Sequence, residues 1–214
     1  MPKFFTVTFG STDDEQFAEP IDPQYEAEAP KCPKCGQKLA NERWIPPYEV
    51  SLAKDPSDDI YRSFIGVELL TSEMLAKALA PLKGVQDICE VRVVKNGREL
   101  SPSIRLYTIQ VKHSYVRVDF DACGVVWSTA PSPTCCGFCG PGGGGDGGCV
   151  WSFERIVLDL RHWDGEDIFY PINLAGTLIA TGDAVRKAQL EEFPSLRITP
   201  IEEYFSSYDR SKTA

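Results

Sequence analysis

Cysteine pairs with the spacing of metal-binding knuckles occur twice in the chain. Cys32 and Cys35 form the first pair, Cys136 and Cys139 form the second, and glycine follows each pair directly. A CxxC turn places two thiolates on one side of a tight loop, and the glycine permits a left-handed backbone that turns amide groups toward the sulfurs. Four thiolates are a donor set that tetrahedral zinc prefers. The sequence therefore predicts one structural zinc site.

Three other uses of these cysteines are less consistent with their surroundings. A thioredoxin-like redox pair requires CxxC at the start of a helix after a strand, but Cys35 and Cys139 run into GQKLANERW and GPGGGG. The spacing matches no usual iron–sulfur run. Catalytic zinc needs an open position, usually beside histidine or carboxylate, and His113 and His162 lie near neither knuckle in sequence. A structural metal would instead tie the early part of the chain to its later half.

The remaining cysteines have no clear place in this site. Cys135 adjoins Cys136 and is an alternative ligand, although its spacing to Cys139 is one residue too long. Cys89 lies in ICEVRVV, which predicts a buried core thiol. Cys123 and Cys149 flank an irregular stretch. We interpret them as bystanders, with a second partial site or an oxidation-prone pair as the alternatives.

No catalytic constellation emerges from the sequence. Charged residues surround His162, namely Asp159, Arg161, Asp164, Glu166 and Asp167. Because no nucleophile signature or second histidine lies nearby, a solvated turn is the favoured interpretation. The chain also lacks a Ser-His-Asp order, a Walker motif and a dinucleotide fingerprint. We therefore expect a non-enzymatic protein with no catalytic residues.

The elements that must position the knuckles are mostly strands. A helix is predicted from Ser72, as its cap, to Leu82. Asn96-Gly97 is a strong hairpin signal. Glycine and proline fill the segment 128–149, which predicts a flexible loop that carries the second knuckle. Strand patterns cover residues 4–9, 85–95, 103–112, 115–120 and 151–160.

An internal echo suggests two related units. Residues 58–78 and 166–188 each have an acidic-Ile-aromatic start, an apolar stretch and a helix that ends in Lys-Ala. A short apolar strand follows each helix, near Val85 and at Leu196–Ile198. Duplication and coincidence both remain open. We predict an α+β fold of mixed strands and a few helices, with two related strand–helix–strand units and the zinc site as a brace. The chain 1–214 is predicted to be one domain, or two subdomains, 1–122 and 123–214.

Composition restricts the partners. Against 31 acidic side chains there are 22 basic ones, for a formal net charge of -9, which repels phosphate backbones and suits a basic protein partner. An ordinary solvated acidic surface is the plainer explanation. No run approaches the roughly 18 apolar residues of a membrane span, and the first residues lack a signal-peptide pattern. We expect a cytoplasmic protein that binds neither membrane nor nucleic acid, in a compartment that favours metal ligation over disulfides.

The knuckles and the later half of the chain resemble a known family. The two CxxCG motifs and the tail GEDIFYPINLAGTLIATGDAVRKAQLEEFPSLRITPIEEY are similar to the double-CxxCG-motif proteins of myxobacteria and related bacteria. In that family the second motif precedes an aspartate-aromatic element, an apolar strand and a helix. These features match Asp167–Phe169, Thr177–Ala180 and Thr181–Ala188. The glycine-rich insertion after Gly140, the extra Cys135, and Gly137 where the first knuckle has Pro33 depart from the pattern.

The family is associated with immunity proteins of polymorphic toxin systems. The resemblance implies a non-enzymatic bacterial protein that binds and neutralises a cognate toxin in the cytoplasm. The alternative is a zinc-ribbon protein that binds nucleic acid or acts in transcription. Basic residues near the first knuckle bear on that alternative, namely Lys31, Lys34, Lys38 and Arg43. A nucleic-acid reader ordinarily shows a broader basic stripe with aromatics.

Overall fold

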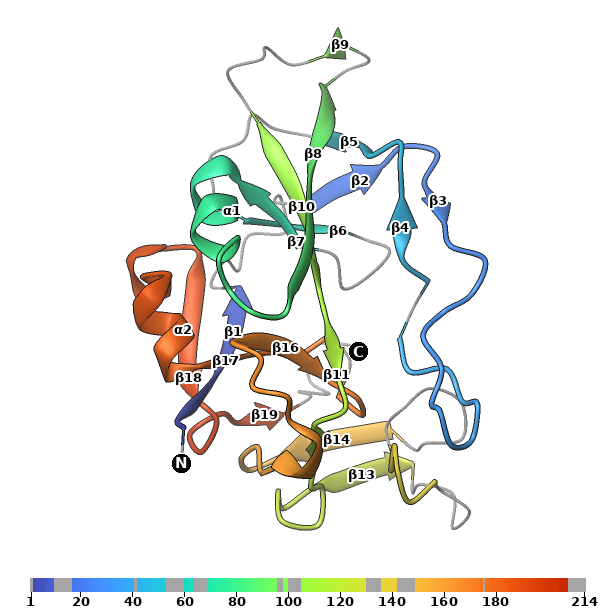
Figure 1. Cartoon of the computed structure of the whole chain (residues 1–214), viewed down its shortest axis with the longest axis vertical. Coiled ribbons are helices and arrows are strands. Elements are labelled where there is room, and N and C mark those ends of the chain that lie inside the picture. Colours follow the sequence, from blue (N-terminus) through green and yellow to red (C-terminus); the bar gives the residue numbers. More distant parts are fainter. Residues whose placement is uncertain are drawn as a thin grey trace, which may run out of the picture.

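The fold is mixed α+β, as predicted, and consists mostly of strands. The computed structural model describes residues 2–9, 17–40, 42–52, 60–63, 69–95, 98–99, 105–129, 136–141, 149–174 and 176–207. Two α-helices and two short 3-10 helices, η1 (Leu160–His162) and η2 (Leu190–Glu192), occur in this part of the chain. Figure 1 shows a group of strands at the top, a second sheet below it, and both α-helices on one side.

Most strands of the upper group form a closed ring. They are β2 (Phe17–Pro20), β5 (Glu49–Leu52), β6 (Ile60–Ser63), β7 (Leu69–Ser72), β8 (Val85–Lys95) and β10 (Leu106–Val111). The order is β10-β7-β6-β2-β5-β8, and β10 also pairs with β8, so the ladder returns to its first strand. The short β9 (Arg98–Glu99) extends from β8. Trp44, Leu70 and Leu106 belong to the buried core of this group.

The second sheet brings together strands from both ends of the chain. Its order is β11-β16-β17-β1-β18. The strands are β1 (Phe4–Phe9), β11 (His113–Ser114), β16 (Ile168–Pro171), β17 (Leu178–Thr181) and β18 (Leu196–Pro200). Because β1 pairs with both β17 and β18, this sheet takes strands from both sides of the predicted subdomain boundary near residue 122.

Three small pairings complete the described structure. In chain order, their strands are β3 (Gln24–Tyr25) with β4 (Trp44–Ile45), β12 (Arg117–Val118) with β15 (Leu158–Asp159), and β13 (Val126–Thr129) with β14 (Cys149–Phe153), which also pairs with β19 (Ser206–Ser207). The ends of the predicted 128–149 loop therefore lie in strands, and the rest of that loop outside 136–141 is not among the described residues. No helix in the described part of the chain is long and apolar enough to cross a membrane.

Both α-helices begin after a residue whose side chain caps the first turn, and for the first helix this is the predicted Ser72. Helix α1 (Glu73–Leu79) starts after Ser72, whose Oγ accepts a hydrogen bond from the Leu75 amide at 3.3 Å. Helix α2 (Gly182–Lys187) starts after Thr181, whose Oγ1 accepts one from the Ala184 amide at 3.1 Å. Such a bond satisfies an amide that has no partner within the helix. Helix α1 ends before the predicted Leu82.

The two strand–helix–strand segments share one topology. In the first, β7 and β8 both run antiparallel to β10, which lies between them. In the second, β17 and β18 both run antiparallel to β1. Each helix therefore connects two parallel strands across a central antiparallel strand. Their origin by duplication remains a prediction.

The two predicted strands nearest the second knuckle are interrupted. Within the strand expected over 115–120, only residues 117 and 118 are in a strand, β12; just before it, where β11 ends, the Ser114 hydroxyl accepts the Val116 amide at 3.3 Å. The strand expected over 151–160 stops at Phe153, since the next amides donate elsewhere: Glu154 to the Cys123 carbonyl and Ile156 to that of Ile201. Asn96 and Gly97 lie outside the described residues, although Lys95 and Arg98 pair antiparallel on either side of them.

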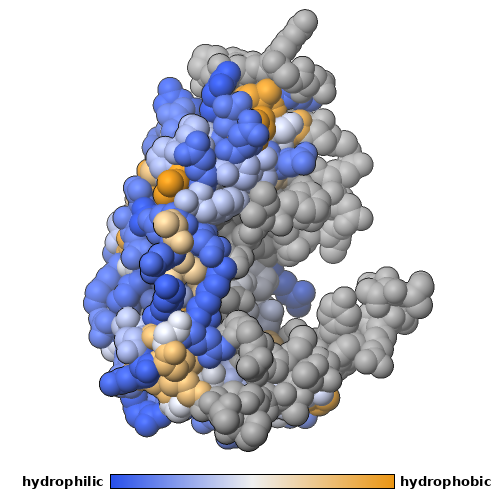
Figure 2. All heavy atoms as spheres, turned by 90° about the vertical axis from the view of Figure 1, so that its right-hand side faces the viewer, coloured by the Kyte–Doolittle hydropathy of each residue, from blue (hydrophilic) through white to orange (hydrophobic). Residues whose placement is uncertain are grey.

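One close contact fixes the ring against the second sheet. Gly84 has φ +113°, and a Cβ there would lie 1.9 Å from the Ile168 carbonyl oxygen. The Lys83 carbonyl accepts hydrogen bonds from the amides of Asp167 and Ile168, at 2.7 and 3.1 Å. Beneath this contact, both helices pack into a single core with β1, β10 and β16. On the face in Figure 2, hydrophilic side chains predominate among the described residues, and apolar ones form small separate areas.

Candidate metal centre

The first knuckle lies in the excursion between β3 and β4. In Figure 1 this excursion descends along the right-hand side to the level of β14 and returns. The Cys32 amide donates to the Gln37 carbonyl at 2.8 Å, and the Gly36 amide donates to the Cys32 carbonyl at 2.9 Å. Gly36 has φ +75°, the left-handed conformation for which glycine was predicted. Local backbone bonds thus form the turn that presents both thiols.

The second knuckle repeats this geometry. The Gly140 amide donates to the Cys136 carbonyl at 2.7 Å, and Gly140 has φ +68°. The Phe138 amide also donates to the Cys136 sulfur at 3.4 Å. Amide-to-sulfur bonds of this kind delocalise thiolate charge, as expected for a metal ligand.

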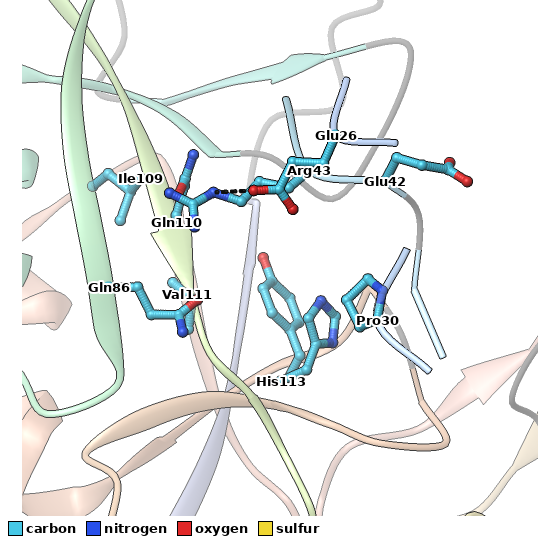
Figure 3. A pocket seen from close by; sticks show the side chains of 10 residues that line it. Glu26, Pro30, Glu42, Arg43, Gln86, Ile109, Gln110, Val111 and His113 are labelled. Carbon is cyan, nitrogen blue, oxygen red and sulfur yellow. Dashed lines mark ion pairs between the residues drawn. The ribbon is translucent and has the colours of Figure 1, made fainter. Parts of the chain in front are cut away.

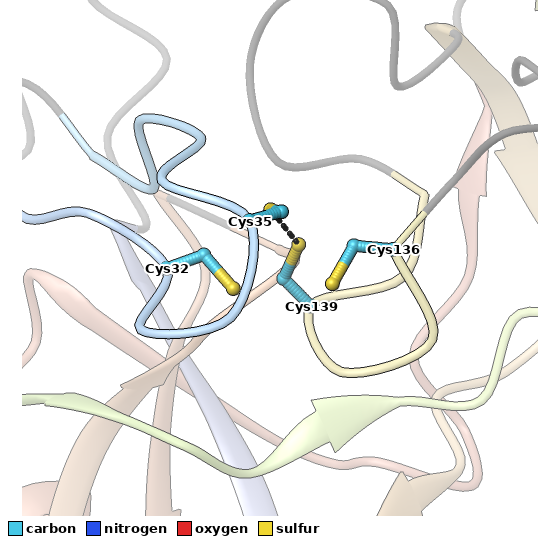
Figure 4. Close-up of side chains that lie close together, drawn as sticks. All are labelled: Cys32, Cys35, Cys136 and Cys139. Atoms are coloured by element: carbon cyan, nitrogen blue, oxygen red, sulfur yellow. Dashed lines mark hydrogen bonds between the residues drawn. The ribbon is translucent and has the colours of Figure 1, made fainter.

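The four predicted cysteines converge on one point. The sulfurs of Cys32, Cys35, Cys136 and Cys139 all lie within 4.8 Å of one another, and Figure 4 shows the two turns facing each other. The Cys35 and Cys139 sulfurs are 3.7 Å apart, close to the roughly 3.8 Å edge of a tetrahedron with 2.3 Å Zn–S bonds. A disulfide requires about 2.05 Å. All four are free thiols, so the cluster can hold one metal ion.

The cluster has an apolar inner side and a more open outer side. Cys32 and Cys139 are buried, with exposed fractions of 2% and 0%, and they pack with Leu39 and Ile172. Cys136 is half-buried and Cys35 is exposed. Burial reduces access of water to the inner sulfurs, which is typical of a structural site.

The thiols differ in acidity. Hydrogen bonds from the amides of Cys139 and Phe138 lower the pKa of Cys136 to about 7. Burial raises the pKa of Cys139 well above its ordinary value. The Cys139 thiol donates to Gln37 Oε1 at 3.7 Å. A bound cation would compensate the cost of ionising the buried thiol.

Residues that the sequence did not single out hold the second knuckle to the body. Arg117 donates through Nη1 to the Gly137 carbonyl at 2.8 Å, and its Nη2 lies 3.3 Å from Asp159 Oδ2. Buried Asn173 clamps the strand that carries Arg117, since its side chain bonds the Val118 amide at 2.7 Å and the Val118 carbonyl at 2.9 Å. Gln37 directly follows Gly36, so its place in the first knuckle was visible in the sequence. The residues around Arg117 give no indication that its side chain contacts the second knuckle.

Two further cysteines that the structure describes, Cys89 and Cys123, lie apart from this cluster. Cys123 is buried, and its sulfur accepts the Val157 amide at 3.2 Å, a packing role. Cys89 is only half-buried, so the prediction of a buried core thiol was wrong; it lies in the long strand β8, and its thiol interacts with the Tyr48 hydroxyl. Cys135 and the side chain of Cys149 lie outside what the structure describes, so their interpretations remain predictions.

The charged residues around His162 are largely structural. Glu166 is 1% exposed and accepts a hydrogen bond from Lys112 at 2.7 Å, so the predicted solvated turn was wrong for this residue. The ion pair and the Asp164 amide compensate its burial. His162 itself is exposed, and its ring lies 5.4 Å from that of Phe138 in the second knuckle.

By fold and site, the chain is an α+β protein with a cluster of four cysteines that can hold a metal ion. No family model matches the chain, and no curated protein matches its sequence.

Proposed function

We propose that this protein is a zinc-stabilised, non-enzymatic immunity protein that binds and neutralises a cognate bacterial toxin. The observation that carries the proposal is the meeting of two CxxCG knuckles from distant parts of the chain in one cluster of four sulfurs. That arrangement is the feature through which the sequence resembles the double-CxxCG immunity proteins.

Zinc is the metal that the donor set favours. Four thiolates whose sulfurs all lie within 4.8 Å of one another match structural zinc, which needs no open coordination position. The amide bonds to Cys136 and the apolar contacts of Cys32 and Cys139 suit a closed site. In this proposal the ion supplies structure only, and it fastens the β3–β4 excursion to the second knuckle.

A fixed excursion would favour tight binding to a protein. Ordering a loop during association costs free energy, and a loop that is already braced avoids that cost. The formal net charge of -9 would also accelerate encounter with a basic partner. Tight neutralisation then needs an interface of ordinary size with a few buried anchor residues.

The nucleic-acid alternative is less well supported by the charges around the first knuckle. Lys31 pairs with Glu28 at 2.9 Å, and Lys38 pairs with Glu42 at 2.9 Å. Arg43 lies near Glu26 and Asp87, at 3.9 and 3.6 Å. Most of the positive charge that would contact phosphates is therefore balanced by neighbouring carboxylates.

The test pairs the chain with the protein encoded beside its gene. Expression of that neighbour alone in a bacterial host should stop growth, and co-expression of this chain should restore it. The two proteins should copurify as a complex. Cys139→Ser, which removes a metal ligand, should abolish rescue, whereas Cys89→Ser should preserve it. A toxic neighbour that this chain neither binds nor neutralises would refute the proposal.

A further inference from the structure

A pocket beside the first knuckle is lined by groups that no part of the metal site uses. It has a volume of about 220 Å³ and lies where β10 and β16 meet the excursion, near Pro30. Figure 3 shows Glu26 and Arg43 on one side and His113 with Pro30 on the other. Ile109 and Val111 contribute apolar surface. The pocket thus combines charged and aromatic groups with an apolar wall.

Gln110 brings an unsatisfied acceptor to this pocket. The residue is 7% exposed and lies in strand β10, between the apolar residues Ile109 and Val111. Its Nε2 donates to the Trp44 carbonyl at 3.4 Å and lies 3.3 Å from the Tyr48 hydroxyl. Because the Trp44 carbonyl can only accept a hydrogen bond, the atom of the Gln110 side-chain amide that faces it must be the nitrogen. The buried Oε1 has no hydrogen-bond partner among the described residues.

His113 contributes a second unsatisfied atom. Its ring stacks on that of Tyr170 with centroids 5.2 Å apart and planes 27° from parallel. Nδ1 is buried and has no partner within the described structure. Burial lowers the pKa of His113, so the imidazole is neutral at pH 7 and one of its two nitrogens is an acceptor.

The charges at the pocket favour a cation. Glu26 and Glu42 line it together with Arg43. Outside the lining, Lys38 pairs with Glu42 and Asp87 pairs with Arg43, so the whole group has three carboxylates and two cations. Adding the acceptors of Gln110 and His113 leaves the pocket richer in acceptors than in donors. The complementary ligand carries several donors, a positive charge and an apolar stem.

We propose that this pocket binds an arginine side chain presented by a protein partner. A guanidinium has five donors and no acceptor, its plane can stack on the His113–Tyr170 pair, and its methylene stem suits the wall of Ile109 and Val111. Lysine is the weaker candidate, because its ammonium group is not planar: it cannot stack on an aromatic ring or form the two parallel hydrogen bonds that a guanidinium forms. The inference rests on the proposed function only in taking the source to be a protein.

The test uses the full-length, metal-loaded protein and model compounds. N-acetyl-arginine amide should bind, whereas the neutral isostere N-acetyl-citrulline amide should bind at least about tenfold more weakly, because it lacks the charge. The chain has only 2 histidines, which gives an internal control by nitrogen-15 NMR. Ligand should shift the ring nitrogens of His113 and leave those of His162 in place.

Two variants should act in opposite directions. Glu26→Gln removes a carboxylate and should weaken binding of the arginine amide about fivefold. Arg43→Gln removes the competing guanidinium, releases Glu26 and Asp87, and should tighten binding by a similar factor. Because an unfolded variant could not bind more tightly, a gain of affinity in Arg43→Gln would report on the pocket itself.

Three outcomes would overturn the inference. They are equal affinity for the arginine and citrulline amides, absence of binding at millimolar concentration (a pocket that holds water alone), and a shift of His162 instead of His113. Tighter binding of free arginine than of an arginine flanked by peptide bonds would identify a small-molecule source and would overturn the protein source. None of these measurements uses the toxin, so their failure is distinct from failure of the immunity function.

Discussion

The two knuckles share one local geometry but differ in what holds them to the molecule. Both close with a bond from the final glycine amide to the first cysteine carbonyl, and both glycines have positive φ. Around Gly36, the space that a Cβ would enter is empty within 4 Å. At Gly140, a Cβ would meet Asn173 and Arg117 at 3.5 and 3.7 Å. The glycine of the second knuckle thus packs against side chains of the body, whereas no described residue lies against that of the first.

This difference indicates that the body of the protein positions one knuckle more firmly than the other. The body positions Cys136 and Cys139 through Arg117, Asn173 and the packing of Ile172. In the proposed zinc-bound form, the ion would join the first knuckle, and with it the β3–β4 excursion, to the second knuckle. The pocket at Gln110 and His113 lies on the path of that excursion, since Glu26, Pro30 and Arg43 line it.

Loss of the buried ligand should have the largest effect. Cys139→Ser removes a sulfur with no exposed surface, so we expect loss of bound metal and about 4 kcal/mol of unfolding free energy. Cys32→Ser should also lose the metal. Elemental mass spectrometry and urea denaturation measure the two quantities. Cys89→Ser is the matched control and should retain full metal content; full metal in the Cys139 variant would refute the ligand assignment.

Chelation should act unequally on the two knuckles. Without metal, the first knuckle would keep its own turn and the apolar packing of Cys32 with Ile172, whereas the second would also keep the Arg117 bond to the Gly137 carbonyl at 2.8 Å. We expect amide hydrogen exchange to accelerate at least about tenfold more at Gly36 than at Gly140. Exchange measured by NMR before and after chelation gives this ratio. Equal acceleration at both glycines would mean that the second knuckle is not pre-positioned.

Removing the brace of the second knuckle should cost less than removing a ligand. Arg117→Ala deletes the bond to Gly137 and the ion pair with Asp159, so we expect a loss of about 1 to 2 kcal/mol in unfolding free energy and weaker metal retention. Lys31→Ala, at an exposed ion pair of the first knuckle, should change stability by less than about 0.5 kcal/mol. Similar losses from both variants, in denaturant titrations, would contradict the contrast.

Acid should weaken the ion pair between Arg117 and Asp159, and we expect this to have the smallest effect on stability. The side-chain bond from Arg161, helped by Arg117, lowers the pKa of Asp159 from 3.8 to about 2. Because the folded pKa is the lower one, the unfolded chain binds more protons between these values. The stabilisation is complete above about pH 4 and is lost as the pH falls toward 2. The thermal unfolding temperatures of Asp159→Asn and of the wild type should converge as the pH falls through this window. A difference that stays constant with pH would exclude the Asp159 carboxylate as the source of the stabilisation.

Local sequence pattern was sufficient for much of this structure. The strands at 4–9 and 85–95 have the predicted bounds, because dense β-branched and aromatic runs decide them locally. Ser72 and Thr181 cap their helices through bonds that span three residues. Each CxxCG turn is itself a local structure, so the sequence could predict the two cysteine pairs that meet in the cluster.

What the pattern could not supply is long-range pairing and the groups that depend on it. Closure of the ring through β10, and the pairing of β1 with β17 and β18, join segments with no shared local signal. Arg117 reaches Gly137, and Lys112 reaches Glu166, across such pairings. Gln110 was detectable in principle, because it is a polar residue at a buried position in the run LYTIQV.

The most direct test of the metal centre is elemental analysis of untagged protein purified under reducing conditions, with Cys32→Ser and Cys139→Ser in parallel. The account predicts one zinc and no iron per wild-type chain, and no zinc in either variant. A wild-type protein without metal, whose thiols are free or joined as disulfides, would contradict the centre and remove the main support for the proposed function.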